Sequence, residues 1–174
     1  MTDSATQRTG VQDTSSQRPW WEVIPLTAMS RTQWESLCDR CGRCCLTKLV
    51  DEDNGEWFFT NVSCHLLDTE SCRCTDYAHR SERIADCLTL DPAEVGEDAS
   101  AWTWLPASCA YRRLAEGRPL AWWHPLVSGD ADSVHRAGIS VRQRVVAETH
   151  VHPEQLEWHV VDWFDACDDE GRPE

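Results

Sequence analysis

The spacing of apolar and polar positions predicts short helices and a hairpin rather than long elements. Ser30 and Gln33 have the spacing of a capping box, so a helix is expected to begin at about residue 31. Apolar positions then recur with the 3.6-residue period of one helix face, at Trp34, Leu37, Cys38 and Cys41. Gly42 is expected to end this helix, so that both cysteines leave its last turn on the same side.

Two runs rich in aromatic and β-branched residues predict a β-hairpin over 46–50 and 56–62. The connection contains Asn54-Gly55, a pair that readily adopts the positive φ angles of a tight turn. The second strand delivers Cys64 at its end. Cys72 and Cys74 are expected in a loop, and Cys87 follows a short charged stretch.

The second half of the chain is expected to add smaller elements. These are short helices that begin at Asp91-Pro92, Ser108 and Pro153, and a strand over 139–146. The helix capped by Ser108 would run from Cys109 to about Glu116 and close at Gly117. We therefore predict an irregular α+β fold.

Domain boundaries follow from the same pattern. Residues 1–18 are polar throughout and predict a disordered leader. Residues 19–165 form a single predicted metal-binding domain, and 166–174 an acidic tail that contains Cys167. The 174 residues are about the length of one domain.

Charge and the absence of an apolar segment restrict the partners. The net charge is −14, from 30 acidic and 16 basic side chains, which disfavours binding to nucleic acid and to anionic membranes. No secretory signal and no run of ~18 apolar residues is present. A cytoplasmic location is therefore expected, where disulfides are rare, and this makes a disulfide scaffold the weaker explanation for ten cysteines. No protein partner is indicated.

The cysteines predict a metal site. Cys38, Cys41 and Cys44 have the Cys-x2-Cys-x2-Cys spacing with which ferredoxins hold an iron–sulfur cube, but the fourth cysteine followed by proline is missing. Cys45 adjoins Cys44 and is expected to serve a second metal or a polynuclear site. Eight thiolates would fill two tetrahedral zinc sites, whereas four would fill one cube. The predicted ligands are Cys38, Cys41, Cys44, Cys45, Cys64, Cys72, Cys74, Cys87 and Cys109.

Alternatives remain open for several residues. Cys109 lies on an apolar helix face, so burial as a small hydrophobic residue is as good an explanation as metal binding. Cys167 is expected to be no ligand. His65, beside Cys64, and His124, beside two tryptophans, are the next candidate ligands, although a structural role is the better expectation for His124. The usual phosphate-loop, serine-hydrolase and zinc-protease motifs are absent, so no enzymatic activity is predicted or excluded.

The stretch from Trp34 to Cys45 resembles the YcgN-type bacterial cysteine-cluster proteins, which are related to the YkgJ-like zinc- or iron-chelating family. The resemblance continues through Cys72-Arg-Cys74, Leu105-Pro-Ala-Ser-Cys109 and Trp123-His124-Pro125-Leu126, and covers roughly residues 20–150. It implies that Cys38, Cys41, Cys44 and Cys45 form the family's motif. A similar cluster in flagellin lysine N-methylases makes iron–sulfur-assisted methyl transfer an alternative to a structural or metal-handling role.

Overall fold

The computed structural model describes residues 18–92, 102 and 104–163 of the chain. The leader, the acidic tail with Cys167, and nearly all of the helix predicted at Asp91 lie outside these residues. The predicted domain limits therefore stay predictions.

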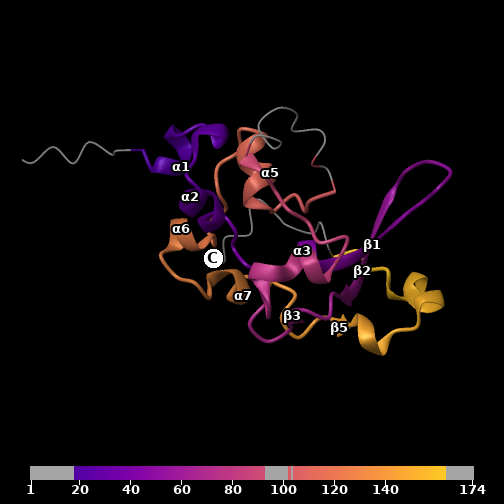
Figure 1. Ribbon diagram of the computed structural model, residues 1–174. Coiled ribbons are helices and arrows are strands. Elements are labelled where there is room, and N and C mark those ends of the chain that lie inside the picture. The colour runs from indigo at the N-terminus through magenta and orange to yellow at the C-terminus, as the bar shows by residue number, and fades with distance from the viewer. Residues whose placement is uncertain (1–17, 93–101, 103, 164–174) are drawn as a thin grey trace, which may run out of the picture.

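Short helices and two small sheets make up the described part, which confirms the α+β prediction (Figure 1). The helical elements are α1 (Trp20–Val23), η1 (Leu26–Ala28), α2 (Arg31–Ser36), η2 (Arg43–Cys45), η3 (Tyr77–His79), α3 (Arg80–Arg83), α5 (Ala110–Ala115), α6 (Pro125–Ser128), α7 (Ser133–Arg136), η5 (Glu148–His150) and η6 (Pro153–His159). The strands are β1 (Leu46–Val50), β2 (Trp57–Ser63), β3 (Leu67–Asp68), β4 (Arg73–Cys74) and β5 (Val146–Ala147).

Helix α2 begins as predicted and ends earlier than predicted. The capping box is complete, because the Ser30 side chain accepts from the backbone of Gln33 and the Gln33 side chain accepts from Ser30. The helix ends at Ser36, before the first cysteine, so the prediction that it continues to Cys41 is wrong. Its continuation is prevented by Arg40, whose φ of 62° lies in the left-handed region.

The predicted hairpin is present as β1 and β2, which pair antiparallel from Leu46↔Ser63 to Val50↔Trp57. Gly55 has the positive φ that the turn requires, and Asn54 does not. The strand predicted over 139–146 is wrong except at its end. Only Val146–Ala147 forms β5, which pairs parallel with β2, because Gln143 at φ 59° bends the chain just before it.

The last two predicted helices are confirmed only in part. Helix α5 closes before Gly117, at φ 70°, as predicted, but its N-cap residue is Cys109 and no side chain caps it. Ser108 is therefore not the cap, and its buried hydroxyl has no hydrogen-bond partner in the described structure. Pro153 opens η6, a 3-10 helix rather than an α-helix, and Trp158 within it is 80% exposed.

Three hydrophobic clusters form the core, and the cysteine run from 38 to 45 lies where they meet. The first cluster is built on Trp34, Leu37, Leu105 and Tyr111, and Cys44 and Cys109 pack against it. The second contains Leu46, Phe59, Cys72 and Val141, with Cys45 packed against it. The third contains Cys41, Trp123, Val134 and Ile139. Successive cysteines of the run thus face different parts of the core.

Candidate metal centre

The loop that carries the first cysteines curls around their sulfur atoms. Left-handed residues at Arg40 and Gly42 turn the chain sharply after Cys38 and again after Cys41. The backbone N–H of Arg40 donates to the Cys38 sulfur, and that of Arg43 donates to the Cys41 sulfur. Each donation favours the thiolate, which is the form that binds metal.

One group of four thiols consists of Cys38, Cys41, Cys44 and Cys109. Charge on Cys44 raises the pKa of each of the other three, so all three lie near it. Loss of hydration is the main cause of the high pKa in each case and raises that of Cys109 to about 12, although the Cys38 residue as a whole keeps an exposed surface. This group, which we call the first quartet, joins the early loop to the start of α5.

A second group consists of Cys45, Cys64, Cys74 and Cys87, and it also lies near Cys44, whose charge raises the pKa of Cys87. Cys74 and Cys64 raise the pKa of the Cys87 thiol, and Cys64 raises that of Cys45. Cys64 follows β2 and Cys74 ends β4, so the two small sheets position it. We call this group the second quartet.

The adjacent pair Cys44–Cys45 joins the two quartets, since a hydrogen bond connects the two sulfur atoms. This bond and the ammonium of Lys48 lower the pKa of Cys44 to about 7, while the pKa of Cys45 is raised. Lys48 Nζ donates to the backbone carbonyls of Cys44 and Leu46 at 2.9 and 3.0 Å, which holds its charge beside the pair. Sequence reasoning missed Lys48 because its position on β1 carries no motif.

Asp39 lies inside the first quartet. Its Oδ1 accepts from the Cys41 N–H at 3.0 Å, while its Oδ2 is buried and has no hydrogen-bond partner in the described structure. The carboxylate raises the pKa of Cys38, Cys41 and Cys109. A buried negative charge among thiols that must ionise is favourable only when a cation occupies the site.

Cys72 is the one predicted ligand that the structure places elsewhere. It is 4% exposed in the second hydrophobic cluster, beside Leu67 and Val141. Its sulfur accepts from Ser140 and lies near Arg142, and no other cysteine is among the groups that chiefly shift its pKa. A small buried residue is the simpler account of this position.

His124 has both ring nitrogens engaged, as expected of a structural residue. Nδ1 accepts from the Leu126 N–H at 3.1 Å, so Nε2 carries the proton and donates to the Leu37 carbonyl at 3.0 Å. The ring is 1% exposed, and burial lowers its pKa. It is a neutral link between α6 and the end of α2 and leaves no nitrogen for a metal.

The separation of the sulfur atoms restricts what the quartets can hold. Among the described residues, Cys64, His65 and Glu148 are the one group of three or more potential ligand atoms that lie within 4.8 Å of one another. The sulfurs of each quartet are therefore spread more widely. Four thiolates on one zinc ion lie about 3.8 Å apart, because each is ~2.3 Å from the metal. Thiolates bound to different ions of one cluster lie further apart.

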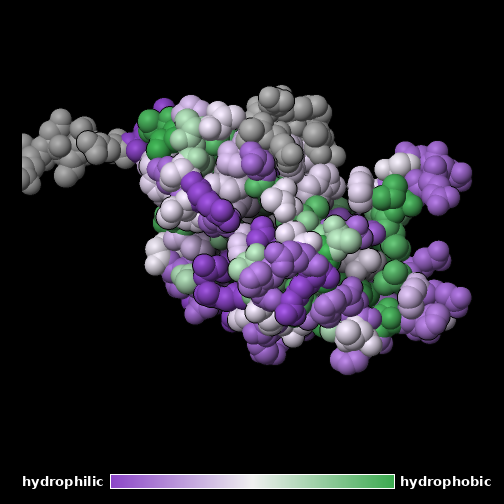
Figure 2. All heavy atoms as spheres, viewed as in Figure 1, coloured by the Kyte–Doolittle hydropathy of each residue, from purple (hydrophilic) through white to green (hydrophobic). Residues whose placement is uncertain are grey.

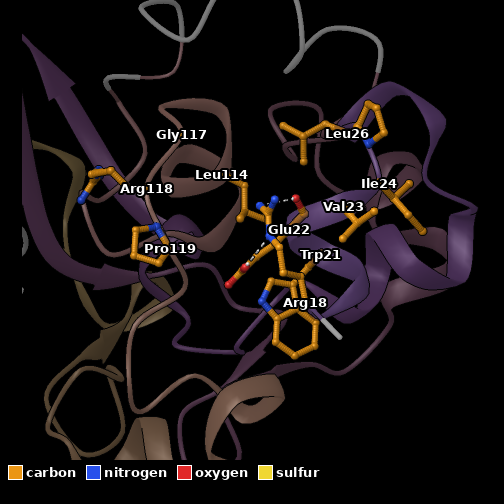
Figure 3. Close-up of a pocket in the computed structure, with 11 residues that line it drawn as sticks. Arg18, Trp21, Glu22, Val23, Ile24, Leu26, Leu114, Gly117, Arg118 and Pro119 are labelled. Carbon is orange, nitrogen blue, oxygen red and sulfur yellow. Dashed lines mark hydrogen bonds and ion pairs between the residues drawn. The ribbon is translucent and has the colours of Figure 1, made fainter. Parts of the chain in front are cut away.

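Other surfaces of the described structure offer less chemistry. A groove of about 570 Å³ between α1 and the end of α5 contains the Arg18–Glu22 ion pair at 3.5 Å and no cysteine (Figure 3). Exposed apolar side chains gather over the β1–β2 hairpin, where Val50, Phe58 and Val160 are 36–46% exposed (Figure 2). None of the described helices has the length and apolar character needed to cross a bilayer.

A small α+β domain that carries the Cys38-x2-Cys41-x2-Cys44-Cys45 motif and further cysteines near it belongs to the class of metal-binding domains. Residues 37–110 match the family model described as "CxxCxxCC: Putative zinc- or iron-chelating domain", and this range contains both quartets. The chain belongs to the UPF0260 family, as its relatives show.

The relatives cover most of the chain. A UPF0260 protein of Rhodopseudomonas palustris is 56% identical over 145 residues, which are 83% of each chain. One of Granulibacter bethesdensis is 56% identical over 83% of this chain and 84% of its own. One of Parvibaculum lavamentivorans is 51% identical over 86% of this chain and 95% of its own. No solved structure matches significantly. The narrower likeness to YcgN-type proteins remains a resemblance.

Proposed function

We propose that this protein holds a polynuclear iron–sulfur centre on its two cysteine quartets and that the centre is its functional part. The observation that carries the proposal is that charge on Cys44 acts on Cys38, Cys41, Cys87 and Cys109, and charge on Cys64 acts on the adjacent Cys45. Isolated buried cysteines would have no reason to gather around a buried carboxylate, whereas metal ligands would.

Two features favour iron over zinc. The Cys38, Cys41 and Cys44 spacing is that of a ferredoxin cube, and Cys109, which lies near Cys44, would supply the fourth ligand that the sequence motif lacks. The wide separation of the sulfurs also suits a centre in which each thiolate binds a different ion. Cys72 is not part of the proposed ligand set.

Zinc is the second candidate, because eight thiolates also suffice for two closed tetrahedral sites. It would require the sulfurs of each quartet to move closer together on binding. Two closed zinc sites would make the protein structural or metal-handling. An iron–sulfur centre would allow electron transfer or cluster-assisted chemistry such as methyl transfer. Because Cys38 is exposed, the side of the centre bound to Cys38 would be accessible to a partner.

Anaerobic purification followed by elemental analysis and a visible absorption spectrum of the same sample tests the proposal. Iron with acid-labile sulfide and broad absorption near ~400 nm is the expected result. Zinc without colour would establish the second candidate instead. A folded protein that contains neither metal and has all its thiols free would contradict both.

Cys74→Ser and Cys72→Ala form a matched pair for the ligand set, since the two residues flank Arg73. Cys74→Ser is expected to lose much of the bound metal. Cys72→Ala is expected to keep all of it and to lose about 1 kcal/mol of stability from the packing against Leu67 and Val141. Equal metal loss from both variants would show that Cys72 is a ligand after all.

A further inference from the structure

A second kind of ligand group lies at the solvent edge of the second quartet. The parallel pairing of β2 with β5 aligns Val62 with Val146 and Ser63 with Ala147. The residue that follows each strand is therefore Cys64 on one side and Glu148 on the other. This register pairs segments 84 positions apart in the sequence and brings the thiol and the carboxylate together.

His65 completes the group. Its backbone N–H donates to Glu148 Oε1 at 2.9 Å, and its ring Nδ1 lies 2.5 Å from the same oxygen. One ligand atom each from Cys64, His65 and Glu148 lies within 4.8 Å of the other two. The two polar side chains are 45% and 40% exposed, so an ion can reach them directly from solvent.

The chemistry of these three side chains suits a divalent transition metal ion. Thiolate, imidazole and carboxylate are the ligand types of zinc sites, and imidazole also suits ferrous iron. Three protein ligands leave a coordination position open, in contrast to a closed set of four thiolates. An open position permits an incoming ligand to bind before another leaves.

We propose that Cys64, His65 and Glu148 form an entry site that captures a divalent ion, Fe²⁺ or Zn²⁺, and passes it to the second quartet. The inference rests on the proposed thiolate centre and holds for either metal. Cys64 belongs to both sites, since its charge acts on Cys45 and Cys87 as well. The ion therefore stays bound to one sulfur while the other ligands change.

The transfer is a ligand exchange without oxidation or reduction. The imidazole and carboxylate leave the ion one after the other, and the thiols of Cys45, Cys74 and Cys87 replace them. Each thiol releases its proton to solvent as its sulfur binds. The Cys64 sulfur already accepts from the Leu66 N–H at 3.4 Å, which holds it toward the shared position.

Stopped-flow binding of Co²⁺ to the metal-free, reduced full chain under anaerobic conditions tests the entry site. Cobalt–thiolate absorption reports arrival at the quartets, and the final cobalt content reports their capacity. His65→Ala combined with Glu148→Gln is expected to slow arrival about tenfold and to leave the final content unchanged. Glu148→Gln alone keeps an oxygen to accept from the His65 N–H and is expected to slow arrival to a smaller extent.

His152→Ala combined with Glu154→Gln is the matched control, because it removes an exposed His–Glu pair at the start of η6, whose ring nitrogen and carboxylate oxygen are 3.9 Å apart. Wild-type arrival rates in this control and slow rates in the first double variant support the proposal. Wild-type rates in both would overturn it, as would a lower cobalt content without any change in rate. Wild-type protein that binds no cobalt would overturn the thiolate centre itself, a separate result.

Discussion

The two quartets differ in their surroundings. In the first, Cys41 is 7% exposed among Trp123, Val134 and Ile139, Cys44 and Cys109 are half-buried against the Trp34 cluster, and Cys38 is exposed. In the second, Cys64, Cys74 and Cys87 are half-buried, and within the described residues the core clusters do not include them. A metal at the first site would therefore be joined to the core through three of its four ligands, while one at the second would be joined to it through Cys45 alone.

Their electrostatic surroundings differ in the same direction. The first quartet contains the buried carboxylate of Asp39, whose Oδ1 accepts from the Cys41 N–H and whose Oδ2 has no hydrogen-bond partner among the described residues. The second has charged groups at its rim, where Arg80 lowers the pKa of Cys87 and Glu148 raises that of Cys64. On the proposed ligand set, this contrast predicts slower metal exchange at the first quartet than at the second.

The difference between the two quartets is tested most strongly by comparing the variants Cys41→Ser and Cys87→Ser. Because a metal that bridges core clusters contributes to folding, Cys41→Ser should lower the free energy of unfolding of the metal-loaded protein by about 4 kcal/mol or more. Cys87→Ser should cost about 1 kcal/mol. Urea unfolding followed by tryptophan fluorescence under anaerobic conditions measures both. Equal losses would mean that the quartets contribute alike.

Gly42→Ala tests how the loop backbone supports the first quartet, and it does so without removing a proposed ligand. Gly42 has φ 78°, and a Cβ there would lie 2.7 Å from Val141 Cγ2 and 3.5 Å from Cys72 Cβ. Strain and overpacking together should cost about 3 kcal/mol and speed the loss of metal to a chelator. Gly138→Ala is the control, since its φ is 70° and no atom lies within 4 Å of its added Cβ. It should cost about 1 kcal/mol and leave metal loss unchanged. Equal costs would show that the contact with Val141 relaxes freely.

Local signals predicted the elements that local interactions determine. The capping box of Ser30 and Gln33, the hairpin over β1 and β2, and the end of α5 at Gly117 all depend on residues close in sequence. Their hydrogen bonds and backbone angles follow from those residues alone. The metal-binding class also followed from local spacing, since the cysteine motif lies within eight residues of sequence.

Tertiary context determined the rest. The helical period through Cys41 was misleading, because the chain instead turns at Arg40 and Gly42 around the sulfurs. Cys109 lies near Cys38 in the structure although the two are 71 positions apart in the sequence. A local periodicity cannot predict a contact over that distance. Asp39 lies between Cys38 and Cys41 in the sequence. A negative charge between two predicted metal ligands was the signal that could have identified it as part of the site. Glu148 required the register of β5.

Asp39→Asn is the mildest change, and it isolates the charge of the first quartet. Asparagine can still accept from the Cys41 N–H, but it removes the negative charge that helps to raise the pKa of Cys109 to about 12. The pKa should fall, so at pH 9 a larger fraction of this thiol is thiolate and iodoacetamide should alkylate it several times faster in the metal-free protein. Mass spectrometry of the peptides measures the rate. Cys87 in the same sample is the control, because its pKa is shifted chiefly by burial, Arg80 and other thiols, and Asp39 is not among these groups. Faster alkylation of both thiols would indicate general loosening of the fold, and no change at Cys109 would show that burial alone sets its pKa.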